Sequence, residues 1–475
     1  MCKWIACVLF LFGVASVAAA QETQETKPNF VLILADDLTY HDLGAFGNDD
    51  VQTPNLDALA ADGMRLTHIF TPAPMCAPTR MSLYTGLYPV RNGGHPNHSR
   101  VRDGVRSMPH YLQPLGYRVG LIGKKHFAPA DNFPFEHLGG SEEDDGNEQQ
   151  FKYEIDPEEV RRFIEPADGD ADASPFCLVV ASNQPHTPWN RGDPSAYDPK
   201  SLTLPPYFVD TPRTRELLAR YYGEITFLDG QVGDVMRVLR ETGHDGNTVV
   251  LFLSEQGSNF AHAKWTLYDT GIRASGIAVA PGRIEPGTTS DALVSYVDVL
   301  PTFHELAGGD PSQLDIDGQS FAGVLRGERD DFRDTIFGIQ TSRGIYDGPE
   351  HYGIRAARDN RFKYIRNLTP EATFSNTVTS NGRPQWFFNT WRKRAEAGDA
   401  FAAEQVERYE HRPAEELYDL EADPYELTNL ATDPTHADKL KDLSTRLDAW
   451  MTQQGDAGQA TELDALNRRR GPNDD

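Results

Sequence analysis

Cysteine is scarce in this chain, with 4 residues among 475. Cys2 and Cys7 fall in an N-terminal segment that we expect to be removed, which leaves Cys76 and Cys177. So few cysteines exclude a scaffold built on disulfides, so either these two form one bond or at least one has a chemical task. Cys177 stands in an apolar run and is interpreted as buried structure, whereas Cys76 does not.

Long apolar runs are also few. One follows Lys3 at residues 4–17 and ends in three alanines at 18–20, a pattern that signal peptidase cuts. Residues 1–20 are therefore interpreted as a signal peptide, the alternative being an N-terminal helix of the mature fold. No later stretch is long and apolar enough to cross a bilayer. We expect a secreted or periplasmic protein with no membrane partner.

Positive charge is outnumbered, since 45 Lys and Arg face 71 Asp and Glu and the net charge is −26. This balance argues against nucleic acid as a partner, because phosphate contacts need basic side chains. Residues 91–125 are nevertheless basic, and this run is either a site for an anion or a solvated surface. Its members are Arg91, Arg100, Arg102, Arg106, Arg118, Lys124 and Lys125, against Asp103 alone.

Buried strands are predicted by apolar, β-branched segments at 30–34, 117–122, 176–181 and 249–253. Helical spacing of apolar residues covers 53–63 and 211–242, and Gly243 ends the second helix. Strands that alternate with helices indicate an α/β fold, a large and mainly parallel sheet sandwiched by helices. The acidic stretch 141–172 is interpreted as a surface insertion.

The pattern changes after residue 330. Segments 352–358 and 362–365 flank a turn and predict a hairpin, and residues 439–451 have helical spacing. We expect a larger α/β domain at 21–330 and a smaller α+β domain at 331–475, with a polar and mobile tail after Gln453.

Polar side chains follow each of the four predicted strands. Asp36 and Asp37 follow the strand at 30–34, and a Gly-Lys-Lys-His element at 123–126 follows the strand at 117–122. A Pro-His-Thr-Pro turn at 185–188 follows the third strand, and a Glu-Gln pair at 255–256 follows the fourth. Any one of them has an ordinary explanation, such as helix capping, a rigid turn or loop polarity. In an open α/β sheet, however, the carboxyl ends of the strands form the ligand site, so we expect these groups to converge.

The residue types indicate a metal beside an anion site. Carboxylate and amide oxygens suit calcium or magnesium, and no Cys/His cluster has zinc spacing. The cationic or proton-transferring candidates are Lys124, His126, His186 and Lys264. A metal that acts as a Lewis acid, next to cations and a proton-transferring histidine, is suited to an anionic ester.

A motif at residues 76–80, Cys-Ala-Pro-Thr-Arg, indicates which kind of anionic ester this site would act on. With its continuation at 83–89 it resembles the Cys-x-Pro-x-Arg signature of type I sulfatases, within the alkaline phosphatase superfamily. The elements at 29–37, 123–126, 185–188, 263–269 and 416–430 also resemble that family, so the likeness spans nearly the whole mature chain. Two departures stand out: Glu255-Gln256 replaces Asp followed by Asn or His, and Lys125 replaces a residue that is often aromatic.

The resemblance implies a role for each matching residue. A formylglycine-generating or other maturation enzyme would oxidise Cys76 to formylglycine. One Ca²⁺ per chain would be held by Asp36, Asp37, Glu255 and Gln256 together with the modified Cys76. Arg80 would stabilise the charged form of that side chain. Sulfate oxygens would be bound by Lys124, Lys264 and His186, and His126 would act as the base.

The implied reaction has two steps. One hydroxyl of the aldehyde hydrate attacks sulfur to give a covalent sulfo-enzyme, and the second loses a proton as sulfate leaves. The basic run, with His95, His98 and Tyr111, could line subsites for an anionic sugar chain, which favours a sulfated polysaccharide or its oligosaccharides. The alternatives are a phosphomonoester or phosphonate hydrolase of the same superfamily, and an inactive protein that binds sulfated glycans.

Overall fold

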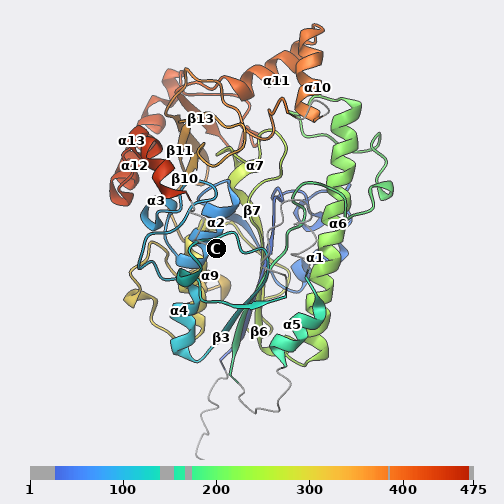
Figure 1. The fold of residues 1–475 in the computed structure, drawn as a ribbon, viewed down its shortest axis with the longest axis vertical. Helices are drawn as coiled ribbons and strands as arrows, with labels where there is room; N and C mark the ends of the chain where they lie inside the picture. Colours follow the sequence, from blue (N-terminus) through green and yellow to red (C-terminus); the bar gives the residue numbers. More distant parts are fainter. Residues whose placement is uncertain (1–26, 140–154, 166–173, 383–385, 470–475) are drawn as a thin grey trace, which may run out of the picture.

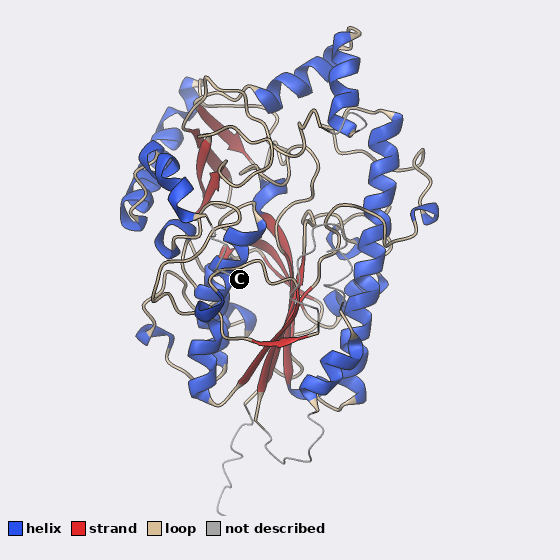
Figure 2. Cartoon of the chain, in the orientation of Figure 1, coloured by secondary structure: helices blue, strands red, loops and turns tan. Residues whose placement is uncertain are grey.

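Two sheets organise the protein in the computed structural model, which describes residues 27–139, 155–165, 174–382 and 386–469 (Figures 1 and 2). The predicted signal peptide lies outside these residues. The large sheet has the order β4-β3-β5-β1-β6-β7-β2-β8, with β9 beside β2, and only β7 runs antiparallel to its neighbours among the described strands. Its strands are β1 (Asn29–Ala35), β2 (Met64–Phe70), β3 (Arg118–Gly123), β4 (Glu136–Leu138), β5 (Phe176–Ala181), β6 (Thr248–Ser254), β7 (Arg273–Val279), β8 (Thr288–Ser290) and β9 (Val294–Ser295).

Both faces of the large sheet are covered by helices. Val31 and Ile33 of β1 pack in the core beneath the long helix α6 (Pro212–Glu241), while Leu32 and Leu34 belong to the core of the opposite face. Successive side chains of a strand point to opposite faces, so a strand that is apolar throughout is buried on both. Figure 1 shows α6 on one face and α2 and α4 on the other. The covering helices are α1 (Pro54–Ala61), α2 (Cys76–Thr85), α3 (Pro89–Asn92), α4 (Met108–Leu112), α7 (Asp269–Ile272), α8 (Val299–Leu306) and α9 (Ala322–Leu325).

The smaller sheet is antiparallel and has the order β10-β11-β12-β13. The hairpin predicted after residue 330 is its β11–β12 pair. These strands are β10 (Ile336–Thr341), β11 (Gly353–Arg358), β12 (Phe362–Asn367) and β13 (Glu415–Asp419), with helices α10 (Phe387–Glu396), α11 (Ala400–Glu410) and α12 (Ala437–Gln454). The predicted fold class is confirmed. One apolar core contains residues of both sheets, and the domain division at 330 stays a prediction.

The chain after Gln453 is ordered as far as residue 469, so the expectation of a mobile tail is wrong for this part. Helix α13 (Gln459–Asp464) carries Glu462, which is fully buried. Its carboxylate lies 2.9 Å from the guanidinium of Arg355 on β11, which also contacts Asp456 at 2.5 Å. Asp456 and Glu462 thus pair with Arg355 inside the protein, and hydropathy alone does not reveal that pairing.

The interpretation of 141–172 as a surface insertion needs a correction for its middle part. Residues 157–164 form α5 (Pro157–Ile164), and Val160, Phe163 and Ile164 of this helix are buried. Phe163 packs so closely on Gly120 of β3 that a Cβ at Gly120 would lie 2.6 Å from the ring. The rest of the stretch lies mostly outside the described residues.

Among the described helices, none has the length and apolar character needed to cross a membrane.

Candidate active site

The carboxyl ends of β1, β3, β5 and β6 meet at one edge of the large sheet, as the strand-end rule predicts. Backbone hydrogen bonds tie the segments together just past the strands: Asp36 N–H donates to Gln184, Glu255 N–H to Ala35 and Lys124 N–H to Ala181. The polar residues after each strand are therefore held side by side by the sheet itself.

Cys76 lies at the centre of this edge. Ligand atoms of Asp36, Asp37, Cys76 and Glu255 all lie within 4.8 Å of one another, and all four residues are buried. The thiol Sγ is 3.4 Å from Asp36 Oδ1. Asp37 has a φ of 64°, a left-handed conformation that turns the chain at the end of β1. The alternative role of the two aspartates as helix caps is thus wrong, since their carboxylates face the cysteine.

The start of α2 presents Cys76 to the cluster. Cys76 is the first residue of this helix, and the preceding Met75 provides no side-chain cap. The loop before it is shaped by Thr79, whose hydroxyl donates to the Ala73 carbonyl at 2.6 Å and lies 2.8 Å from the hydroxyl of Thr71. These two threonines were not among the predicted site residues, because their effect is to fix a loop rather than to contact a ligand.

Three cations surround the carboxylates. The Lys264 ammonium lies 2.6 Å from Asp37 and donates to Cys76 Sγ at 3.2 Å. Lys124 forms an ion pair with Asp36, so the lysine chosen from the motif is the one that reaches the cluster. Arg80 contacts Glu255 through its Nε at 2.5 Å and donates from Nη1 to the Lys124 carbonyl at 2.8 Å, and its implied stabilisation of the charged residue 76 stays a prediction.

The charges in the cluster control its protonation. Burial opposes ionisation of Asp36, but Lys124, His186 and Arg80 outweigh it and hold the pKa of this carboxyl low. Burial and the neighbouring Asp36 raise the pKa of Glu255 to about 8. Burial and the two carboxylates also raise the pKa of the Cys76 thiol, the opposite of what activates a cysteine nucleophile.

Two of the predicted histidines lie in different surroundings. His186 Nε2 is 3.6 Å from Asp37 Oδ2, and its Nδ1 lies 2.6 Å from the Thr187 carbonyl. Burial and the two lysines lower the pKa of His186, so the ring is neutral at neutral pH. His126, two residues after Lys124, has its Nε2 3.1 Å from Nδ1 of His98.

The donor set fits a hard divalent cation. Three carboxylates so close together repel one another, and a cation between them relieves that repulsion. Gln256 also points into the cluster, with its amide nitrogen 2.6 Å from Asp37 and 3.4 Å from Cys76 Sγ. Its carbonyl oxygen is buried without a hydrogen-bond partner. Rotation of this amide would exchange the nitrogen for an oxygen ligand.

Most of the basic run does not line the site. Arg91 pairs with Asp317, and Arg118 donates to the Phe163 carbonyl. His95 is only 3% exposed, so it is not available to a sugar chain and its expected subsite role is wrong. Of this run, Lys124 reaches the cluster and His98 reaches His126. Cys177 is a free, buried cysteine, as is Cys76, so no disulfide joins them.

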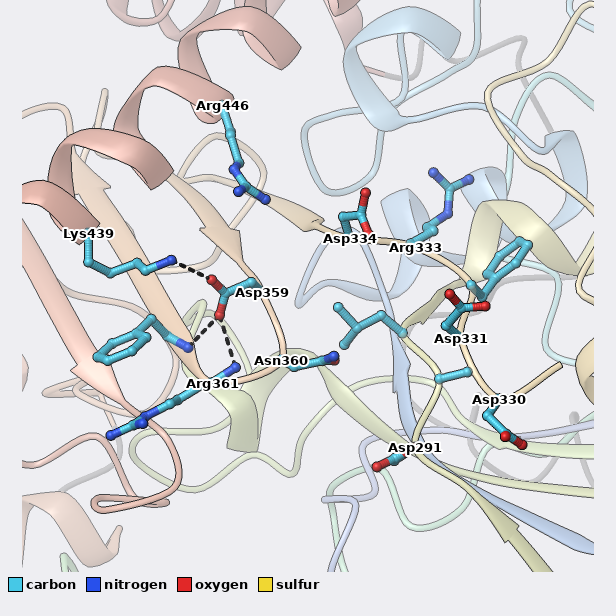
Figure 3. A pocket seen from close by; sticks show the side chains of 14 residues that line it. Asp291, Asp330, Asp331, Arg333, Asp334, Asp359, Asn360, Arg361, Lys439 and Arg446 are labelled. Carbon is cyan, nitrogen blue, oxygen red and sulfur yellow. Dashed lines mark hydrogen bonds and ion pairs between the residues drawn. The ribbon is translucent and has the colours of Figure 1, made fainter.

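A cavity of about 550 Å³ lies elsewhere, between the loops around Asp291 and Asp330 and the β11–β12 turn with α12 (Figure 3). One pair of its charges is joined by a hydrogen bond from Lys439 to Asp359 at 3.1 Å, and Arg333 pairs with Asp298 outside the cavity. None of the predicted site residues lines it, so it is separate from the cluster around Cys76.

Comparison with known families gives two matches. The family model described as Sulfatase matches residues 28–309. A second model, described as N-sulphoglucosamine sulphohydrolase, C-terminal, matches residues 258–377. The first match contains every predicted site residue.

Individual proteins agree with the family matches. The chain is 31% identical to an ulvan-active sulfatase of Formosa agariphila over 95% of this chain and 88% of the relative. It is 30% identical to the N-sulphoglucosamine sulphohydrolase of Homo sapiens, over 90% of each. A crystal structure from Bacteroides fragilis superposes with a TM-score of 0.71 at 21% identity, covering 94% of this chain and 99% of that one, which supports the fold.

Proposed function

Because the chain belongs to the sulfatase family, whose members are sulfuric ester hydrolases, we propose that it removes sulfate from a sulfated saccharide through a formylglycine made from Cys76. The observation that carries this proposal is the position of Cys76, buried between carboxylates and lysines at the start of a helix. In the structure its Sγ stands for an oxygen of the oxidised side chain. The hydrated aldehyde would offer one hydroxyl to attack sulfur and a second to release the sulfate.

Calcium fits the same cluster. Asp36, Asp37, Glu255 and Gln256 would hold one Ca²⁺ beside position 76, where it would supply positive charge that favours an ionised hydroxyl and a bound sulfate oxygen. Arg80 contacts both Asp36 and Glu255, so its role here is to fix the carboxylates and balance their charge.

The lysines are placed to bind the sulfuryl group. The Lys264 ammonium lies 3.2 Å from Cys76 Sγ and pairs with Asp37, and the Lys124 ammonium pairs with Asp36, which is itself 3.4 Å from that sulfur. Sulfate oxygens would be further partners for these ammoniums, and His186 is close enough to join them. His126 is assigned as the base that takes the proton of the second hydroxyl.

A saccharide substrate is supported by the relatives, one of which acts on ulvan and another of which is named for N-sulphoglucosamine. Secretion fits such a substrate, and the apolar segment at residues 4–17 supports secretion. The match of residues 258–377 to the C-terminal model of N-sulphoglucosamine sulphohydrolases favours including N-sulfates beside O-sulfates in any substrate panel.

The first experiment is mass spectrometry of the peptide that contains residue 76, after expression with a maturation enzyme. We expect a loss of about 18 Da relative to cysteine, the mark of formylglycine. Unmodified cysteine in a fully active enzyme would exclude the proposed nucleophile.

Turnover is tested with Cys76→Ala, which should abolish hydrolysis while leaving the fold intact. Cys177→Ala is the matched control, since it removes the other buried thiol and should change turnover by less than about twofold. The panel pairs N- and O-sulfated glucosamines, and it pairs a sulfate ester with the phosphate ester of the same alcohol. Faster cleavage of the phosphate would favour the phosphohydrolase alternative.

A further inference from the structure

We propose that His98 is a positioning residue that holds His126 in the tautomer needed for proton transfer. The inference rests on the proposed function in one respect, the assignment of His126 as the base. The two residues come from segments 28 positions apart, and His126 Nε2 lies 3.1 Å from His98 Nδ1. Their ring centroids are 4.9 Å apart at an angle of 46°. This is hydrogen-bond geometry between two imidazoles rather than a chance approach of ring edges.

Both histidines of the pair also have an unusual backbone conformation. His98 has a φ of 52° and His126 a φ of 49°, in the left-handed region that costs energy for a residue with a Cβ. Of the seven described non-glycine residues with positive φ, Asp37 belongs to the Cys76 cluster and Trp265 follows Lys264, which contacts that cluster. Residues held in such conformations concentrate at functional sites, where the surrounding structure enforces them. Both histidines are therefore held in place at a cost.

The enforcing contacts are visible on both sides of the pair. Val101 N–H donates to the Ala128 carbonyl at 2.8 Å, which joins the two loops just beyond the two histidines. Ser99 forms an isolated bridge with Arg469. Gly344 lies so close to the Asn97 carbonyl that an added Cβ would be 2.0 Å from that oxygen. His98 is thus fixed by backbone contacts on both neighbours, and its ring is presented to His126.

Arg468, near the C-terminus, binds the loop that carries His98, and we call this contact the C-terminal strap. The side chain donates from Nε to the Gly93 carbonyl and from Nη2 to the Arg100 carbonyl, both at 3.0 Å. The Arg468 carbonyl in turn accepts from Arg100 N–H at 3.0 Å. Both ends of the loop that carries His98 are therefore bound to one residue.

The contact decides which nitrogen of His126 can accept a proton. A hydrogen bond between two imidazoles needs one N–H and one lone pair. If His126 Nε2 carries the hydrogen and His98 Nδ1 accepts it, the lone pair of His126 remains on Nδ1, which can then take a proton from a hydroxyl. A second group that fixes a histidine tautomer in this way acts through orientation, without touching the substrate.

Two substitutions at residue 98 distinguish the effect of the side chain from the effect of the backbone conformation. His98→Asn places an amide oxygen near the position of Nδ1, and asparagine tolerates positive φ. His98→Gly accepts that φ at no steric cost but has no acceptor. We expect the asparagine variant to keep about a third or more of kcat, and the glycine variant to lose about tenfold or more with little change in KM. Equal turnover of the glycine variant and the wild type would overturn the inference, as would equal losses in both variants.

A double-mutant cycle tests whether the effect passes through His126. In a His126→Ala background, His98→Gly should reduce kcat by less than about twofold, because its target is gone. A loss that multiplies fully with that of His126→Ala overturns the inference alone. Wild-type turnover of His126→Ala overturns the assigned base as well, so the two failures are distinguishable.

A third readout does not depend on activity. Nitrogen NMR of histidine-labelled protein should report His126 with hydrogen on Nε2 in the wild type and in His98→Asn, and a mixture of tautomers in His98→Gly. The same tautomer in all three proteins contradicts the proposal.

Discussion

Gln256 shows how a single residue can depart from a family pattern and keep its place. Its side chain is one methylene longer than the asparagine common at this position in the family. The amide nevertheless lies within 2.6 Å of Asp37 and 3.2 Å of Glu255. The chain therefore accommodates the longer residues at 255 and 256 within the same cluster, and the sequence already indicated oxygen donors there. The amide nitrogen would face the carboxylates when no cation is bound, and the amide oxygen would face a bound cation.

We expect Gln256→Leu to weaken calcium binding. Leucine is one bond shorter than glutamine and has no oxygen, so one ligand is lost while the carboxylates stay. In thermal unfolding after chelation, added Ca²⁺ should raise the Tm of the wild type. A tenfold weaker affinity removes about 1.4 kcal/mol of that stabilisation at saturation. The control is Gln113→Leu at an exposed position. An unchanged dependence of Tm on calcium in Gln256→Leu would exclude Gln256 as a ligand.

Among the secondary-structure elements, those that are held by hydrophobic burial could be predicted from the pattern of apolar residues. The four strands and α6 were found because their apolar residues face one core or two. Elements held by paired charges were missed, as α13 demonstrates. Its anchor is the pairing of Arg355 with Glu462, both fully buried. A charged residue in a polar segment looks solvated unless its partner is known, and this partner lies on β11, more than 100 positions earlier.

Removal of Arg355 should show how much its pairing with Glu462 contributes to the free energy of unfolding. Arg355→Met leaves two buried carboxylates, Asp456 and Glu462, without their cation. Breaking a buried pair in this way costs about 3–5 kcal/mol of unfolding free energy. The matched control on the neighbouring strand is Arg366→Met, whose partner Asp448 is 62% exposed, and it should cost about 1 kcal/mol or less. Urea unfolding measures both, and similar losses in the two variants would refute the anchoring role.

The C-terminal strap makes a separate prediction for activity. Arg468→Met removes the two bonds to the loop of His98 while keeping the length of the side chain. We expect kcat to fall several-fold with KM nearly constant, because the loop holds His126 less firmly. Arg329→Met, at an exposed pair with Asp331, should leave kcat unchanged. A loss in KM alone would place the strap's effect on substrate binding instead.

For the whole molecule, the site was predictable because parallel strands end at one edge, so residues far apart in sequence could be placed together without coordinates. The pairing of His98 with His126 was not predictable in the same way. It arises where two loops meet, and loop contacts follow no period in the sequence. The wrong expectation for His95 has the same origin, since three residues before the exposed His98 the chain turns inward.

Buried histidines also give the protein a stability that depends on pH, and His95 is one of them. Burial and the cations Arg355, Arg468 and Arg102 lower the pKa of His95 to about 3, against the opposing charge of Asp456. The unfolded chain binds this proton below its ordinary pKa of about 6.5, while the folded protein does not. The resulting stability is therefore fully present above pH 6.5 and is lost as pH falls from 6.5 towards 3. Between pH 7.5 and 5.0 the loss should reach about 2 kcal/mol. We expect His95→Phe to remove this part of the acid sensitivity, whereas the exposed His411→Phe should not. Unfolding free energies measured at pH 7.5 and 5.0 test this, and a parallel fall of wild type and His95→Phe would show that His95 is not the source.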